Sequence, residues 1–163
     1  LTASRLLAEE VRKHVSLENA TVVSPDVGGA SRARDFASLL GLETAIIEKK
    51  RNEDGVKVFN VIGDVAGRDV LIVDDMFDTG GTTVKGANLL KEKGANRIFA
   101  AATFPVLSKG PDVLNNSIIE KFFTTDAINQ ENLGEKWYTV EIAPMIAEAI
   151  NCKEEGLSLS AIF

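Results

Sequence analysis

Short runs of apolar residues alternate with amphipathic stretches along this chain. Leu6, Leu7, Val11 and Val15 recur at helical spacing and predict a helix over about residues 2–15. The same patterns predict helices over residues 30–40, 82–93 and 143–150, and strands over residues 20–24, 44–48, 56–62, 70–73, 97–103, 118–124 and 137–142. Strands that alternate with helices favour an α/β fold, with a mostly parallel central sheet and helices on both faces.

Three polar segments follow predicted strands, at residues 25–29, 49–55 and 74–83. Because ligands bind outside the carboxyl ends of parallel strands, we expect these segments to converge on one edge of the sheet. The segment "KKRNEDG" at residues 49–55 carries no core residue and is expected to be a mobile loop beside a β-hairpin arm over residues 56–62.

The composition adds limits on size and partners. The 163 residues, 45% of them hydrophobic, suit a single domain over residues 1–163 with a core of its own. A net charge of −6 argues against nucleic acid and against a basic membrane-binding face. Cys152 is the only cysteine, so a cytoplasmic, reducing setting is expected. No signal peptide is recognisable, and the chain opens at Leu1 without Met, so upstream residues are expected to be missing or removed.

Candidate chemistry concentrates in "VLIVDDMFDTGGTT", Val70 to Thr83. Gly80 and Gly81 allow a sharp turn that exposes backbone N–H groups, and the helix start that follows favours an anion such as a phosphate. Carboxylates would repel a bare phosphate but suit sugar hydroxyls or magnesium-bound water. A loop with both kinds of group predicts a sugar-phosphate site, with hydroxyl donors and acids at Thr79, Thr82, Thr83, Asp74, Asp75 and Asp78.

Other interpretations of this stretch are weaker. A plain turn with capping Asp and Thr would explain one acid but not three beside two glycines. Neither G-x-x-x-x-G-K-[ST] nor G-x-G-x-x-G occurs, which excludes the common nucleoside triphosphate and dinucleotide loops. A response-regulator receiver begins with its acid pair, whereas here strands precede Asp74 and too few residues follow it.

The same stretch resembles the signature of the type I phosphoribosyltransferase fold, which binds phosphoribosyl pyrophosphate or ribose 5-phosphate. The wider pattern is similar to the ribose-phosphate pyrophosphokinase family, on "VVSPDVGGASRAR", "IIEKKR", "NVIGDVAGRD", "TFPVLS" and "LSLSAIF". The resemblance spans nearly all of this chain but only the carboxyl-terminal half of the family's protein. It implies that the half with the adenine-binding residues and a metal-ligand histidine is absent, and that this chain alone is inactive.

The resemblance also implies roles for individual residues. Lys49 and Arg51 match the family's catalytic pair, and Arg51 is also expected at the ribose 5-phosphate. Asp26 matches a magnesium ligand at the start of a pyrophosphate loop, Asp26, Val27, Gly28 and Gly29. The ribose 5-phosphate site is expected at Asp74, Asp75, Asp78, Thr79, Gly80, Gly81, Thr82 and Thr83. Taken alone, Asp26 could cap a helix, and residues 49–51 could be a solvated basic run.

Two positions depart from the family pattern. Glu48-Lys49-Lys50-Arg51 stands where Asp-Lys-Arg-Arg is usual, and Phe104 stands where His is usual. His14, the only histidine, lies in no motif and is expected to be exposed or half-buried. "SLS" at residues 158–160 resembles a regulatory phosphate-binding region only weakly.

Three functions therefore compete. The favoured one is ribose-phosphate pyrophosphokinase, with Mg²⁺, ATP and ribose 5-phosphate as ligands and a hexamer expected by resemblance. The alternatives are a phosphoribosyltransferase that consumes phosphoribosyl pyrophosphate and a non-catalytic regulatory subunit. A phosphoribosyltransferase would share residues 74–83 but would not need "EKKR" or the terminal "LSLSAIF".

Overall fold

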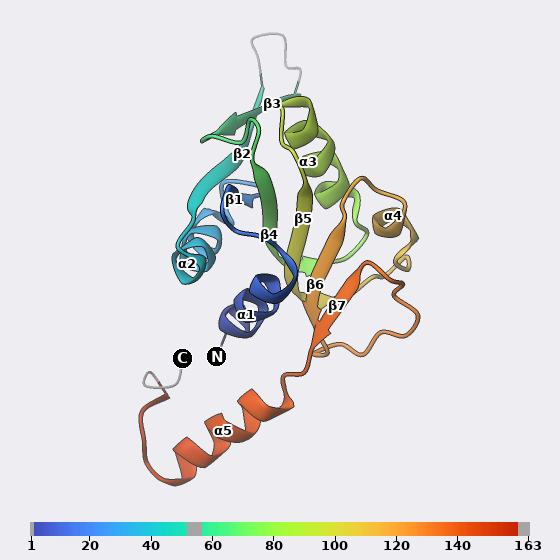
Figure 1. The fold of residues 1–163 in the computed structure, drawn as a ribbon. Helices are drawn as coiled ribbons and strands as arrows, with labels where there is room; N and C mark the ends of the chain where they lie inside the picture. The colour runs from blue at the N-terminus through green and yellow to red at the C-terminus, as the bar shows by residue number, and fades with distance from the viewer. Residues whose placement is uncertain (1, 52–56, 160–163) are drawn as a thin grey trace.

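The chain forms a seven-stranded sheet covered by helices, as seen in a computed structural model that describes residues 2–51 and 57–159 (Figure 1). The side chains of residues 50, 51, 57 and 58 also lie outside this description. The elements in chain order are α1 (Ser4–His14), β1 (Ala20–Ser24), α2 (Ala30–Leu40), β2 (Glu43–Arg51), β3 (Lys57–Ile62), β4 (Asp69–Phe77), α3 (Gly81–Glu92), β5 (Ile98–Pro105), α4 (Asp112–Asn115), β6 (Lys121–Thr125), β7 (Trp137–Val140) and α5 (Ala143–Glu154).

The strand order is β3-β2-β1-β4-β5-β6-β7. All neighbouring strands run parallel except β2 and β3, which form an antiparallel hairpin. The chain moves outward from β1 to β3 and then returns to β4 on the other side of β1. The strand order therefore reverses between β1 and β4, and a crevice at the carboxyl ends of these two strands is where such a sheet binds ligands.

Two hydrophobic cores hold the helices against opposite faces of the sheet. On one face α1 and α2 pack through Leu7, Val11 and Phe36. On the other face α3 packs through Ala87 and Leu90. Successive strand residues supply the two cores in turn, because side chains along a strand alternate between faces; in β4, Ile72 belongs to one core and Leu71 and Val73 to the other.

The predicted α/β architecture and most of its elements are confirmed. The helix predicted over residues 30–40 and the strand predicted over residues 20–24 have the expected bounds. The predicted hairpin arm is β3, paired antiparallel with β2. The short helix α4 was not predicted, and α5 extends to Glu154 rather than ending at Ile150.

Two predicted loops are wrong in part. Residues 49–51 were expected in a mobile loop, but β2 continues through Arg51 because its backbone stays paired with β3. Residues 74–77 were expected in the acidic loop, but β4 continues to Phe77 because β5 pairs with it as far as Phe77↔Pro105. Both errors come from polar side chains on strands whose hydrogen-bonding partner was not visible in the sequence.

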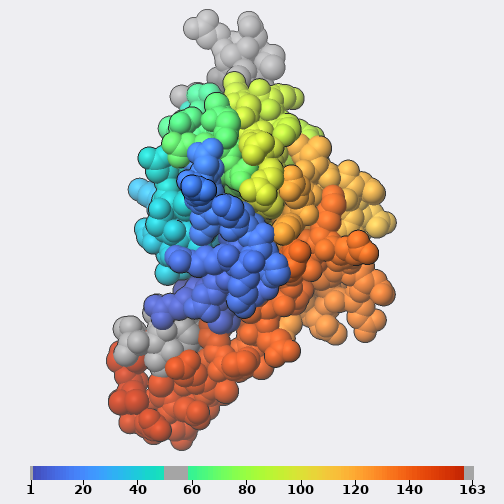
Figure 2. All heavy atoms as spheres, in the orientation of Figure 1, coloured from blue at the N-terminus to red at the C-terminus, as the bar shows by residue number. Residues whose placement is uncertain are grey.

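The last helix stands apart from the rest of the domain. α5 projects beyond β7, and in the space-filling view its residues form a separate lobe below the body (Figures 1 and 2). Ala149 is its only buried residue, whereas Ile146 and Ile150 are exposed. Within the described residues, no helix is long and apolar enough to cross a membrane.

Candidate functional site

An acidic cavity lies at the crevice between the carboxyl ends of β1 and β4. Its volume is about 300 Å³, and its lining residues are Asp26, Asp74, Asp75, Met76, Asp78, Thr79, Gly80, Thr82 and Thr83. Residues far apart in the sequence meet here because β1 and β4 are neighbouring parallel strands, with Val23 beside Ile72. Eight of these nine residues were predicted as site residues, and Met76 was not.

The end of β4 holds the two adjacent carboxylates in place. The backbone N–H of Asp75 donates to Asp74 Oδ1 at 2.8 Å, and the N–H of Met76 donates to Asp75 Oδ1 at 3.0 Å. Since both bonds tie a side chain to its own strand end, the carboxylates are fixed before any ligand arrives.

Arg32 contacts the two carboxylates of the site, and sequence analysis did not identify it as a site residue. Its Nη1 donates to Asp74 Oδ1 at 3.0 Å, and its Nη2 lies 3.5 Å from Asp75 Oδ2. Arg32 comes from α2, the helix that begins at the glycines after β1. The sequence did offer one signal for it. In "ASRAR" a charged residue lies in the first turn of the predicted helix, next to alanines that pack against the sheet.

The pKa values of the two carboxyl groups are shifted in opposite directions. Burial, together with the neighbouring Asp75 carboxyl, raises the pKa of Asp74 to about 6, and the charge of Arg32 only partly opposes this. Burial would also raise the pKa of Asp75, but hydrogen bonding from Asp74 and the charge of Arg32 outweigh it and lower that pKa. Near pH 6 the pair therefore holds about one negative charge firmly and a second one weakly.

The loop from β4 into α3 leaves its donors available. Gly80 precedes α3 with a φ of 76°, and no side chain caps the first turn of this helix. The first N–H groups of α3 point out of the helix start, where an anion is favoured. Asp78 is anchored to the segment that follows β5, because the N–H of Ser108 donates to its Oδ1 at 3.3 Å.

Gly80 is required for two separate reasons. Its positive φ suits glycine, and a Cβ there would lie 2.9 Å from Leu114 Cγ. We expect Gly80→Ala to lower the free energy of unfolding by about 2–4 kcal/mol, as backbone strain and overpacking add. Gly110→Ala is the matched control, since its φ is 75° and nothing lies within 4 Å of its added Cβ. Chemical denaturation of both variants measures the difference, and equal losses would contradict the contact with Leu114.

The predicted pyrophosphate loop is only partly at the cavity. Asp26 lines it, but Val27, Gly28 and Gly29 do not. The Oδ1 atom of Asp26 accepts a 2.8 Å hydrogen bond from the N–H of Gly29, so this side chain does stabilise the turn into α2. The glycines let that turn close, because a Cβ on Gly29 would lie 2.8 Å from Ser24 Oγ.

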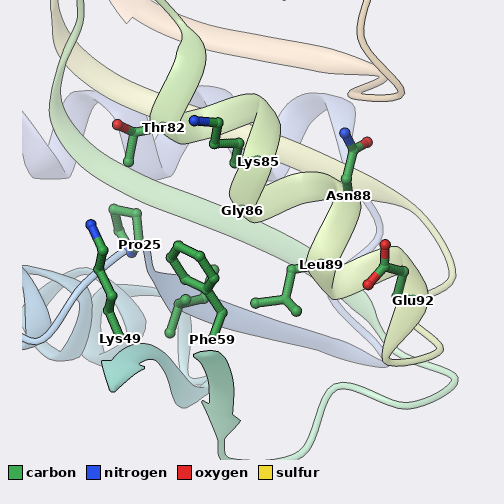
Figure 3. Close-up of a pocket in the computed structure, with 10 residues that line it drawn as sticks. Pro25, Lys49, Phe59, Thr82, Lys85, Gly86, Asn88, Leu89 and Glu92 are labelled. Atoms are coloured by element: carbon green, nitrogen blue, oxygen red, sulfur yellow. The ribbon is translucent and has the colours of Figure 1, made fainter. Parts of the chain in front are cut away.

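Lys49, the member of the predicted catalytic pair whose side chain the structure describes, does not line the acidic cavity. Lys49 lines a second cavity of about 370 Å³ between the β2–β3 hairpin and α3, and the Arg51 side chain lies outside the described residues (Figure 3). Thr82 lines both cavities, so the two adjoin at the start of α3. Gly81 is the first residue of α3 and lines neither cavity.

Two other singled-out residues, His14 and Phe104, do not line the acidic cavity. His14 is half-buried, as expected; its Nε2 atom is 2.9 Å from Glu10 Oε1, and its ring lies against Tyr138. Phe104 lies on β5 opposite Met76 and is 41% exposed.

The carboxylate oxygens in the cavity lining are ligands that a hard cation such as Mg²⁺ prefers. Magnesium is commonly held by one or two carboxylates, with substrate phosphates and water completing its shell, and Asp26 and its neighbours offer such carboxylates. Among the described residues, no three His, Cys, Asp or Glu side chains form a group that could hold a metal by themselves. The donor set therefore fits a cation shared with a bound ligand rather than one held by the protein alone.

The amino-acid sequence of the chain is similar to those of ribose-phosphate pyrophosphokinases. It is 46% identical over its whole length to a ribose-phosphate pyrophosphokinase of Aquifex aeolicus, covering 53% of that protein. It is 44% identical, again over its whole length, to one of Chlorobaculum tepidum, covering 51%. The chain thus spans about half the length of the curated relatives it matches.

Solved structures give the same likeness. The fold matches phosphoribosylpyrophosphate synthetase from Mycobacterium smegmatis with a TM-score of 0.85 and 35% identity, over 94% of this chain and 51% of the other. A purine phosphoribosyltransferase from Pyrococcus horikoshii matches with a TM-score of 0.53 and 24% identity, which shows the shared fold alone. Residues 55–163, which include the acidic strand end and the loop into α3, match the phosphoribosyl synthetase-associated domain, and the chain belongs to that family.

Proposed function

We propose that this chain supplies the ribose 5-phosphate site of a ribose-phosphate pyrophosphokinase, which transfers a pyrophosphoryl group from ATP to ribose 5-phosphate. The observation that carries the proposal is the acidic cavity, where carboxylates and an uncapped helix start face one space. A phosphate suits the N–H groups and hydroxyls at Thr79, Thr82 and Thr83, and the sugar hydroxyls suit Asp74 and Asp75. The likeness to ribose-phosphate pyrophosphokinases supports this choice over the alternatives.

In this reaction the anomeric hydroxyl oxygen of ribose 5-phosphate attacks the β-phosphorus of ATP. The bond from that phosphorus to the oxygen of the α-phosphate breaks, AMP leaves, and the hydroxyl proton is lost. Such a transfer depends on positioning and charge neutralisation more than on covalent chemistry. The carboxylates at the end of β4 would orient the sugar, and the start of α3 would hold its phosphate.

Magnesium would be held by Asp26 together with oxygens of the bound pyrophosphoryl group, and it would neutralise the charge of that group. Arg32 would keep the Asp74–Asp75 pair oriented through its two contacts. Lys49 and Arg51 would contact the transferring group from the neighbouring hairpin. The hexamer expected from the family stays a prediction.

Binding of ribose 5-phosphate tests this proposal without any need for ATP. We expect Asp78→Ala together with Thr82→Ala to weaken binding by about 10-fold or more, because a charge-assisted hydrogen bond contributes about 1.5–3 kcal/mol. Titration calorimetry measures the affinity. The control pair is Asp35→Ala with Thr139→Ala, both exposed and away from the cavity. Unchanged affinity in the test pair would refute the assignment of the cavity.

A further inference from the structure

The backbone at the end of β5 makes a corner, residues 105–108, that is bonded to the end of β4. The N–H of Leu107 donates to the carbonyl oxygen of Phe77 at 2.9 Å, and the N–H of Ser108 donates to Asp78 Oδ1 at 3.3 Å. Phe77 is the last residue of β4, and Asp78 is the first residue of the loop into α3. The β5 corner therefore contacts this loop from the protein side, and its residues do not line the acidic cavity.

Leu107 has a backbone conformation that is unusual for a residue with a side chain. Its φ is 47°, and only one other non-glycine residue among those described has a positive φ. The left-handed region is strained for a leucine, so a residue stays there only where its surroundings hold it. The Leu107 side chain is buried, and its carbonyl oxygen accepts a 2.8 Å hydrogen bond from the N–H of Gly110, which fixes one side of the corner.

Gln130 holds the other side of the β5 corner. It lies in the connection between β6 and β7, and its Nε2 atom donates to the carbonyl oxygen of Pro105 at 2.8 Å and to that of Val106 at 3.1 Å. An amide NH₂ group has two donors, so this one side chain can bond both carbonyl oxygens. The two carbonyls come directly before Leu107, and Gln130 therefore restrains the backbone that enters the strained residue.

The segment that carries Gln130 is itself anchored to the sheet. The N–H of Asp126 donates to the carbonyl oxygen of Val140, the last residue of β7, at 3.0 Å. The Oδ1 atom of Asp126 accepts a 2.9 Å hydrogen bond from the N–H of Ile142. Because residues 126–130 start from a fixed point, Gln130 can act as a support for the β5 corner.

We propose that Gln130 is a positioning residue for the ribose 5-phosphate site, because it holds the β5 corner and the corner holds Asp78 at the start of the loop into α3. This inference rests on the proposed function, since it names a support of that same site. Gln130 does not line the acidic cavity, so it acts through Ser108 and Asp78 rather than on the ligand.

Calorimetric titration with ribose 5-phosphate tests the role of Gln130. Gln130→Met keeps the length of the side chain and removes both donors. We expect it to weaken binding by about 3- to 10-fold, within the range that one neutral hydrogen bond contributes to an equilibrium. Gln130→Glu is a second variant without donors at neutral pH, since a carboxylate can only accept hydrogen bonds, and it should weaken binding at least as much.

Asn19→Leu is the matched control. The Nδ2 atom of Asn19 also donates to a backbone carbonyl oxygen, that of Gly67, at 3.0 Å. These two residues precede β1 and β4, so the contact lies at the opposite edge of the sheet from the acidic cavity. Ribose 5-phosphate affinity should equal that of the parent chain in this variant. Circular dichroism checks that each variant is folded.

A double-mutant cycle separates positioning from general stabilisation. If Gln130 acts through Asp78, then Gln130→Met should change the affinity by less than about 2-fold in a chain that already carries Asp78→Ala. Effects of the two substitutions that multiply fully would overturn the proposal. Parent-like affinity of both Gln130 variants, or an equal loss in Asn19→Leu, would also overturn it.

Amide hydrogen exchange in the free chain gives a measurement that needs no ligand. The Ser108 N–H should exchange about 3- to 10-fold faster in Gln130→Met than in the parent and at the parent rate in Asn19→Leu. A parent chain that does not bind ribose 5-phosphate would refute the proposed function. Normal binding in the parent with unchanged exchange at Ser108 in Gln130→Met would overturn the role of Gln130 alone.

Discussion

Replacing Lys49 and Arg51 together by alanine should lower kcat for pyrophosphoryl transfer by about 10³–10⁵-fold in an active enzyme that carries this chain. The Lys49 ammonium lies 5.7 Å from the centroid of the Phe59 ring, in the cavity that adjoins the carboxylates. It lines a different space from the one proposed for ribose 5-phosphate. Its charge should therefore matter most when the pyrophosphoryl group moves between the substrates, and KM for ribose 5-phosphate should change far less than kcat.

Lys50→Ala is the control, because Lys50 lies between the two residues in sequence and matches neither catalytic position of the family. Initial rates at varied ribose 5-phosphate and saturating ATP separate kcat from KM. A double variant with kcat within a few-fold of the parent would remove both residues from the catalytic machinery. A large rise in KM at constant kcat would instead make them ground-state binding residues.

The sequence was most informative about the fold where apolar runs were bounded by turn residues. The strand at residues 20–24 is buried at every position and is followed by Pro25, so its ends were visible. The ends of strands were not predicted where polar residues continue the hydrogen-bonded pairing with a neighbouring strand. Glu48 to Arg51 on β2 pair with residues 57–60 of β3, and nothing local marks that pairing.

For the acidic cavity the sequence predicted the residue types and their meeting place but not their electrostatic partner. Asp26 and Asp74 could be brought together from the order of strands and loops alone, since both follow or end parallel strands. Arg32 could not, because its contact with Asp74 depends on how α2 is rotated against the sheet. The cavity between the hairpin and α3 was hidden for a similar reason, because Phe59 and Leu89 line one space only through the placement of the hairpin beside α3.

Asp74 should make the folded chain less stable at neutral pH than at mildly acidic pH. Its pKa is about 6 in the folded chain against 3.8 ordinarily, so the folded state retains a proton between about pH 4 and pH 6 that the unfolded state has already lost. The free energy of unfolding therefore falls as pH rises through this window and levels off above it. The ion pair with Arg32 does not reverse the sign, because burial is the larger effect.

We expect Asp74→Asn to remove this penalty and to stabilise the chain at pH 7.5 by about 1–2 kcal/mol, after allowance for solvent screening. At pH 4 the Asp74 carboxyl is protonated in the folded parent, so the gain should largely vanish there. Urea denaturation of parent and variant at several pH values from 4 to 8 measures the difference.

The same variant should bind ribose 5-phosphate more weakly, since an amide replaces a carboxylate that accepts hydrogen bonds from sugar hydroxyls. A gain in stability of equal size at pH 4 and pH 7.5 would show that ionisation of Asp74 is not its cause. Loss of stability at neutral pH would mean that the contact with Arg32 outweighs burial. Stabilisation confined to neutral pH, together with weaker sugar-phosphate binding, would identify Asp74 as a residue whose cost to the fold is offset by its use in the site.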